Sequence, residues 1–226
     1  QLFDSASSTY SYLLADQGEA VLIDPVKDKL DDYLRLLSEL NLRLLLAIDT
    51  HTHADHITAL GELRAATGCR SGFGQQSGSA CASFTFSDGQ ALHFGQRQLL
   101  AWHTPGHTDD SYCFLLPASA DESGKVFTGD TLLIRGSGRT DFQNGDARAQ
   151  WASLQRLLAL PGDTEVWPGH DYRGWTRSSI AEEAAHNPRL QVADGAAYAQ
   201  LMANLKLPNP KLMDIAVPAN RACGQN

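Results

Sequence analysis

Three histidines and two aspartates lie within eight consecutive residues of this chain, in the segment D-T-H-T-H-A-D-H at positions 49–56. The whole chain contains only eight histidines, so this segment is strongly enriched in side chains that bind metal ions. Imidazole and carboxylate groups together suit zinc, iron or manganese. Crowding such groups into a fold is costly unless something binds them. The segment therefore predicts a metal site.

Three more candidate ligands each follow a glycine, in the segments T-P-G-H-T, F-T-G-D-T and W-P-G-H-D. Glycine and proline let the backbone turn sharply and aim the next side chain. The candidate ligands are then His51, His53, Asp55, His56, His107, Asp130 and His170. We expect the histidines outside such turns, His93, His103 and His186, to be ordinary packed or surface residues. Asp49 either ends a strand or accepts a hydrogen bond from a ligand.

The elements around the first segment place it at the end of a strand. The apolar run L-R-L-L-L-A-I-D predicts a buried strand over residues 42–49. The stretch I-T-A-L-G-E-L-R-A-A-T-G behind it predicts a helix that ends at Gly68. The histidine segment thus occupies a strand-to-helix turn, where open α/β sheets commonly hold their sites.

The rest of the pattern alternates strands and helices. We expect two strands around a turn at residues 16–18, a helix near 28–41 and a strand-rich stretch over 82–135. Helices are expected near 146–160, 178–188 and 194–205, and the proline- and asparagine-rich tail from 206 is expected to be extended. This order suggests two β-rich layers covered by helices.

Composition narrows the classes of function. The 226 residues carry a formal net charge of −8 and no long basic run, which argues against nucleic-acid binding. The apolar stretches are too short to span a membrane, and the start shows no signal-peptide pattern. The chain begins with Gln1 rather than Met, which leaves open whether a short segment precedes it. The four cysteines form no C-x-x-C pair, which favours free thiols, although Cys69 and Cys81 could pair in a secreted protein.

The ligand motifs together resemble the metallo-β-lactamase superfamily. The resemblance implies an α/β (α+β) fold, an αββα sandwich of two mixed sheets flanked by helices. Within the superfamily, F-T-G-D-T-L-L-I-R-G-S-G-R-T-D-F-Q-N-G-D and N-L-K-L-P-N-P-K-L-M-D-I-A-V-P-A-N resemble the persulfide dioxygenases of the ethylmalonic-encephalopathy protein type. No rhodanese-like cysteine loop follows, so residues 1–226 are expected to form a single domain.

In that family one Fe(II) is held by two histidines and an aspartate, which by motif are His51, His107 and Asp130. The resemblance implies that glutathione persulfide and O2 are the substrates and that sulfite and glutathione are the products. His53, Asp55, His56 and His170 would then form hydrogen bonds around the iron site. All seven ligand positions of the two-metal hydrolases are nevertheless present, so the sequence leaves a binuclear zinc site open.

A glutathione substrate carries two carboxylates and one amine, so its site needs local positive charge. Arg139 and Tyr172 are the favoured contacts, followed by Asp141, while Lys206 and Lys211 are weaker candidates. Tyr172 resembles the tyrosine that meets glutathione in glyoxalase II enzymes. The alternative is that Arg139 and Asp141 pair with each other and only hold the loop.

Two other functions remain as alternatives. One is a glyoxalase II-type zinc hydrolase of glutathione thioesters, which shares the fold and every ligand but usually has a longer helical substrate domain. The other is a non-catalytic metal- or sulfur-binding protein, which a missing ligand would favour. A homodimer is the default expectation because dimers are the commonest oligomers. The bacterial cytoplasm and the mitochondrial matrix both suit a glutathione-dependent enzyme.

Overall fold

The computed structural model describes residues 1–205, 207 and 212–225, which divide into two compact units. The first unit comprises residues 1–87, residues 92–98 and the described C-terminal segment from residue 212. The second unit comprises residues 88–91 and 99–207, of which 206 lies outside the described residues. The expectation of a single domain over residues 1–226 remains a prediction.

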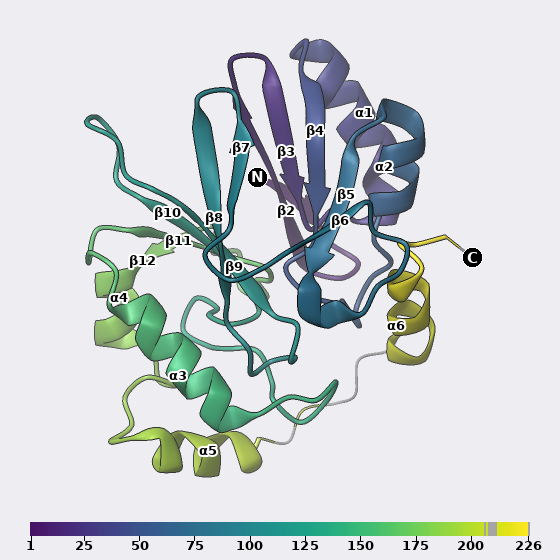
Figure 1. Cartoon of the computed structure of the whole chain (residues 1–226). Coiled ribbons are helices and arrows are strands. Elements are labelled where there is room, and N and C mark those ends of the chain that lie inside the picture. The colour runs from purple at the N-terminus through teal and green to yellow at the C-terminus, as the bar shows by residue number, and fades with distance from the viewer. Residues whose placement is uncertain (206, 208–211, 226) are drawn as a thin grey trace. The chain divides into compact units, whose positions relative to one another are not determined.

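The first unit contains a mixed six-stranded sheet with the order β1-β2-β3-β4-β5-β6 (Figure 1). The pairs β1–β2 and β2–β3 are antiparallel, whereas the pairs β3–β4, β4–β5 and β5–β6 are parallel. The strands are β1 (Leu2–Asp4), β2 (Thr9–Asp16), β3 (Glu19–Ile23), β4 (Arg43–Ile48), β5 (Arg70–Gly74) and β6 (Phe84–Phe86).

Two helices bury their apolar sides against this sheet, α1 (Leu30–Glu39) and α2 (Leu60–Thr67). In α1, Tyr33 and Leu37 recur at helical spacing and pack with Leu22 of β3 and Ala47 of β4. Helix α2 ends at Gly68, whose φ of +73° is the left-handed conformation that glycine adopts at helix ends. Short 3-10 helices, η1 (Lys27–Lys29) and η2 (Gln75–Ser77), precede α1 and follow β5.

The second sheet is also mixed and has the order β12-β11-β10-β9-β8-β7. Strands β10 and β11 are parallel, whereas β8–β9, β9–β10 and β11–β12 are antiparallel. Its strands are β7 (Ala91–Phe94), β8 (Arg97–His103), β9 (Tyr112–Leu116), β10 (Lys125–Gly129), β11 (Glu165–Pro168) and β12 (Ser178–Ser179). By this pairing, β8, β10 and β11 point in the same direction.

The helices of the second unit are α3 (Ala147–Leu158), α4 (Ile180–His186) and α5 (Gly195–Ala203). Helix α3 begins at Asp146, whose carboxylate accepts hydrogen bonds from the backbone N–H groups of Arg148 and Ala149. Leu154 and Leu157 of α3 are fully buried in a cluster with residues of the sheet, α4 and α5. The predicted two mixed sheets flanked by helices are confirmed.

Two expectations about the end of the chain and the cysteines are wrong. Residues Met213–Arg221 form a helix, α6, with Pro218 inside it, where an extended tail was expected. Cys81 and Cys223 form a disulfide, so only Cys69 and Cys113 are free thiols. A disulfide between residues 142 positions apart cannot be read from cysteine spacing alone. The candidate substrate contacts Lys206 and Lys211 lie outside the described residues.

Candidate metal centre

The histidine segment forms the loop that follows β4 in the first unit. His51, His53 and His56 are almost completely buried, at 2%, 0% and 3% exposure. The rings of His51 and His53 lie 4.1 Å apart between centroids, and those of His53 and His56 lie 4.2 Å apart. One ligand atom each from His53, Asp55 and His56 lies within 4.8 Å of the others. The first unit alone therefore gathers a set of groups that could hold a metal ion.

Asp24 fixes the start of this loop and was not among the predicted site residues. Its carboxylate accepts hydrogen bonds from the Thr50 N–H (2.6 Å) and the Thr50 hydroxyl (3.0 Å). The same carboxylate lies 3.1 Å from His53 Nε2. Asp24 is 1% exposed and follows β3, the parallel neighbour of β4. It thus holds the backbone and one imidazole of the loop at the same time.

The electrostatics around His53 favour a cation. Burial on its own lowers the pKa of the His53 imidazole. The charge and hydrogen bond of Asp24, followed by Asp55, raise that pKa well above its usual value. Among the described residues, His53 Nδ1 is a buried nitrogen atom with no hydrogen-bond partner. A buried nitrogen of this kind beside carboxylates suits a metal ligand as well as a proton.

The other end of the loop is held by a second carboxylate. Asp55 Oδ2 lies 2.9 Å from His56 Nδ1 and accepts a hydrogen bond of 2.9 Å from the Thr9 hydroxyl. The Thr58 hydroxyl is 3.2 Å from Oδ1 of Asp49, which is completely buried at the end of β4. Asp49 therefore supports the loop through Thr58, and its predicted role as a hydrogen-bond acceptor for a ligand stays a prediction.

The second unit brings together His107, Asp130 and His170. They follow β8, β10 and β11, three strands that end at the same edge of the sheet. Asp130 Oδ1 lies 2.6 Å from His170 Nδ1, and Asp130 Oδ2 lies 3.5 Å from His107 Nε2. The Nδ1 atom of His107 lies 2.7 Å from the carbonyl oxygen of Arg139. The second unit thus brings a second cluster of imidazole and carboxylate groups together.

Glycines and Gln150 hold this cluster. Gly106, which precedes His107, has φ +143°, and a Cβ there would lie 2.2 Å from Gln150 Cβ. A Cβ on Gly138 would lie 2.4 Å from the Asp130 carbonyl oxygen and 2.8 Å from His107 Nδ1. The buried Gln150 amide donates to the carbonyls of Thr131 and Gly138, each at 3.2 Å. Only glycine allows the chain to approach the ligands this closely.

The predicted substrate contacts lie in the same unit. Arg139 pairs bidentately with Asp141, at 2.6 and 2.8 Å, and its guanidinium lies 4.1 Å from the centroid of the Phe142 ring. The hydrogen bond from Arg139 lowers the pKa of the Asp141 carboxyl below its ordinary value. The side chain of Tyr172 is 73% exposed, and its ring is nearly parallel to that of His170 at 6.1 Å. Arg135, which precedes Arg139 in the same loop, pairs with the buried Glu183 and with Glu182.

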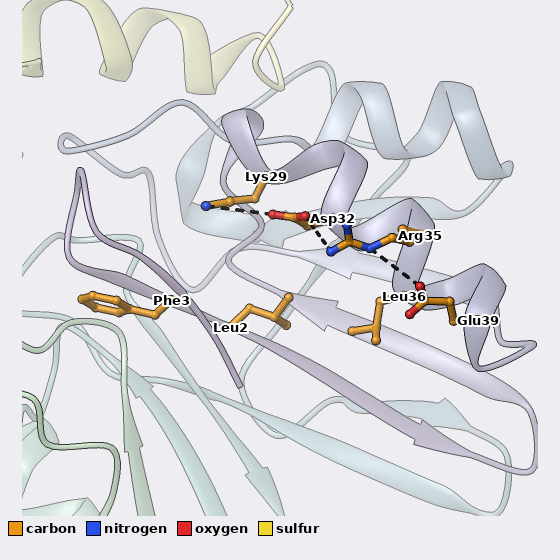
Figure 2. Close-up of a pocket in the computed structure, with 7 residues that line it drawn as sticks. All are labelled: Leu2, Phe3, Lys29, Asp32, Arg35, Leu36 and Glu39. Atoms are coloured by element: carbon orange, nitrogen blue, oxygen red, sulfur yellow. Dashed lines mark hydrogen bonds and ion pairs between the residues drawn. The ribbon is translucent and has the colours of Figure 1, made fainter.

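A pocket in the first unit lies between β1 and α1, lined by Leu2, Phe3, Lys29 of η1 and residues of α1 (Figure 2). Its charged side chains pair with one another, because Asp32 contacts Arg35 at 3.0 Å and Arg35 contacts Glu39 at 3.8 Å. None of the candidate metal ligands lines it. This pocket offers no chemistry that the metal site would use.

The model of the metallo-beta-lactamase superfamily matches residues 5–75 and 83–170. The human protein "Persulfide dioxygenase ETHE1, mitochondrial" is 45% identical over 99% of this chain and 87% of its own length. The crystal structure of ETHE1 from Myxococcus xanthus has a TM-score of 0.94 and 50% identity, and covers 100% of this chain and 98% of that chain. A hydroxyacylglutathione hydrolase of Francisella tularensis subsp. novicida is 30% identical over 87% of this chain and 78% of its own length.

The chain therefore belongs to the metallo-beta-lactamase superfamily and, within it, to the family of the ETHE1 persulfide dioxygenases. The donor set fits a metal ion of this superfamily, since buried and partly buried imidazoles and carboxylates converge in each unit. Among the described residues, no helix has the length and apolar character needed to cross a membrane.

Proposed function

We propose that this protein is an Fe(II)-dependent dioxygenase that oxidises glutathione persulfide. The observation that carries the proposal is the 45% identity to human persulfide dioxygenase ETHE1 over 99% of the chain. In the balanced reaction, glutathione persulfide, O2 and water give glutathione, sulfite and two protons. The outer sulfur atom is oxidised, O2 is reduced, and the sulfur–sulfur bond breaks.

We propose that His51, His107 and Asp130 hold one Fe(II) ion per chain. These residues match the ligand motifs of the family, and two histidines with one carboxylate form the donor set of non-haem Fe(II) oxygenases. When bound, iron supplies open coordination positions and the redox change that oxygenation requires, whereas zinc has no accessible redox change.

In this proposal, His53, Asp55, His56 and His170 orient the ligands instead of binding the iron. Three contacts support that role, because a ring nitrogen of each of the three histidines lies within hydrogen-bond distance of a carboxylate. His53 contacts Asp24, His56 contacts Asp55, and His170 contacts Asp130. Partners of this kind fix the orientation and the tautomer of neighbouring groups.

Arg139, Tyr172 and Asp141 are the proposed glutathione contacts. The exposed Tyr172 lies two residues after His170, and Arg139 lies nine residues after Asp130 in the loop that Asp130 begins. The bidentate pairing of Arg139 with Asp141 is what the loop-holding alternative expects. In this proposal the same pair also fixes the direction of the guanidinium, which binds a substrate carboxylate through its remaining N–H groups.

A zinc hydrolase of glutathione thioesters is the second candidate. It is favoured by the presence of all seven ligand residues and by the relative from Francisella, which is named a hydroxyacylglutathione hydrolase. Its lower identity, 30% against 45%, places it behind the dioxygenase. A non-catalytic binding protein has less support, since no ligand residue is missing.

One experiment separates the two enzymes. The purified protein is loaded with Fe(II) or with Zn(II) and given either glutathione persulfide or a glutathione thioester. We expect sulfite only from the iron form with the persulfide. Thioester hydrolysis by the zinc form, with no sulfite from the iron form, contradicts the proposal. We further propose a compartment that contains glutathione, the cytoplasm or the mitochondrial matrix, and a homodimer that gel filtration can test.

A further inference from the structure

The side chain of Asn220 joins the C-terminal helix to the histidine loop within the first unit. Asn220 lies in the last turn of α6, the yellow helix in Figure 1, and is completely buried. Its partners on the loop lie 162 to 167 residues earlier in the chain. Neither the ligand motifs nor the proposed reaction assigns a role to this residue.

The Asn220 amide satisfies three backbone groups of the loop at once. Its Nδ2 group donates to the carbonyl of His53 at 2.9 Å and to the carbonyl of His56 at 2.8 Å. Its Oδ1 atom accepts a hydrogen bond from the N–H of Thr58 at 2.8 Å. The two carbonyls need donors and the N–H needs an acceptor, so this orientation of the amide is the one the partners require.

Few other side chains could replace it. An aspartate of the same size would keep the bond to Thr58 but would turn an oxygen toward the two carbonyls. An alanine would leave all three backbone groups without this partner in a buried region, which is unfavourable. The requirement thus concerns the amide group itself and not only the volume that the side chain fills.

Residues just after Asn220 make their own contacts with the first unit, and these contacts hold the end of α6 in place. Cys223 is bonded to Cys81, and its carbonyl accepts from the Gly61 N–H at 2.9 Å. The Gly224 carbonyl accepts from Lys27 Nζ at 2.7 Å. Gly224 has φ +74°, and a Cβ there would lie 2.0 Å from the Thr58 carbonyl oxygen. The end of the chain is thus fitted closely against the end of the loop.

We propose that Asn220 is a positioning residue that sets the affinity and geometry of the metal site by fixing the backbone between His53 and Thr58. The proposal rests on the proposed metal-dependent function. The loop carries His51, His53, Asp55 and His56, so a shift of its backbone moves several candidate ligands together. Residues that orient metal ligands commonly change metal affinity by about 10- to 100-fold when they are removed.

The test compares Asn220→Ala and Asn220→Asp with Ala216→Gly, a matched control in the same helix. Ala216 is fully buried, and glycine there weakens α6 without removing a hydrogen bond to the loop. Dissociation constants for Fe(II) and for Zn(II) are measured anaerobically by competition with a chelator. The melting temperature of the metal-free proteins and the electron paramagnetic resonance spectrum of the Fe(II)–nitric oxide adduct are recorded alongside.

We expect Asn220→Ala to weaken metal binding at least tenfold and to change the spectrum, while Ala216→Gly keeps the wild-type constant and spectrum. If Asn220→Ala does not fold, Asn220→Asp carries the comparison with the same expected loss. Constants within twofold of the wild type, or an equal loss in Ala216→Gly, overturn the role of Asn220. Binding of zinc but not iron by the wild type contradicts the dioxygenase alone, and Asn220 is then judged on the zinc constants. Binding of neither metal overturns both proposals.

Discussion

The carboxylate of Asp130 contacts the imidazole of His170 with 2.6 Å between Oδ1 and Nδ1. The second oxygen of the same carboxylate lies 3.5 Å from Nε2 of His107. Asp130 therefore links the two candidate-ligand histidines of the second unit, His107 and His170, and its removal affects both.

We expect Asp130→Ala to abolish iron binding and sulfite formation while the protein stays folded, because the change removes one of three proposed ligands. Iron content by elemental analysis and the melting temperature of the metal-free protein check this. Asp163→Ala serves as the control, since Asp163 is exposed and contacts only Ser123 among the described hydrogen bonds. Stoichiometric iron in the Asp130 variant would refute its assignment as a ligand.

His170→Ala distinguishes an orienting histidine from a ligand of a second metal. In the dioxygenase account, the wild type holds one iron per chain, and this variant binds it about 10- to 100-fold more weakly. Metal titration followed by elemental analysis gives both quantities. Two metals per chain in the active wild type, reduced to one in the variant, is the result that the hydrolase account requires.

Arg139→Ala should raise the KM for glutathione persulfide by about tenfold or more, since a charge-assisted hydrogen bond contributes about 1.5–3 kcal/mol. The expected change in kcat is smaller. Steady-state oxygen consumption at varied substrate gives both constants, with Arg177→Ala as the control because Arg177 is an exposed arginine paired with Glu165. An unchanged kcat/KM shows that Arg139 only holds its loop through Asp141.

The disulfide between Cys81 and Cys223 predicts the thiol count. Protein purified without reductant and then denatured should titrate two thiols, from Cys69 and Cys113, and four after reduction. Cys81→Ser should lower the free energy of unfolding by about 2–5 kcal/mol, as is typical for the loss of a native disulfide. Four thiols before reduction would show that the bond is not formed in the isolated protein.

Alkaline pH should destabilise the fold through Tyr33. Burial raises the pKa of the Tyr33 hydroxyl to about 12, above its ordinary value of 10.0. The unfolded chain therefore loses this proton first, and the free energy of unfolding falls as pH rises from about 10 to about 12. The loss amounts to roughly 2–3 kcal/mol for a shift of this size. Urea unfolding across this range should show a smaller fall in Tyr33→Phe, and an equal fall would assign the effect to other groups.

Local patterns were enough to predict most of the fold. Tyr33 and Leu37 recur at helical spacing because α1 buries one face. The apolar run of β4 is continuous because this strand is buried on both faces. The structure confirms both elements. Strand β5 was not predicted because it is short and contains Gly72 and Gly74. Gly72 is needed there because a Cβ would lie 2.6 Å from the Phe84 ring, which a local pattern cannot reveal.

The candidate ligands could be predicted from sequence because each lies in a turn and carries an imidazole or a carboxylate, which are recognisable as metal-binding groups. Their supports were not found, since Asp24, Gln150 and Asn220 act through contacts between residues far apart in the chain. The C-terminal helix was missed for a related reason. Pro218 and its asparagine-rich surroundings disfavour a helix locally, whereas the burial of Ala216 and Asn220 against the first unit stabilises it.

The most direct measurement is oxygen uptake by the iron-loaded protein on addition of glutathione persulfide, with sulfite assayed in the same sample. The account predicts rapid uptake in which one O2 is consumed for each sulfite formed, and no uptake by the zinc-loaded protein. No uptake by protein that demonstrably holds iron would contradict it.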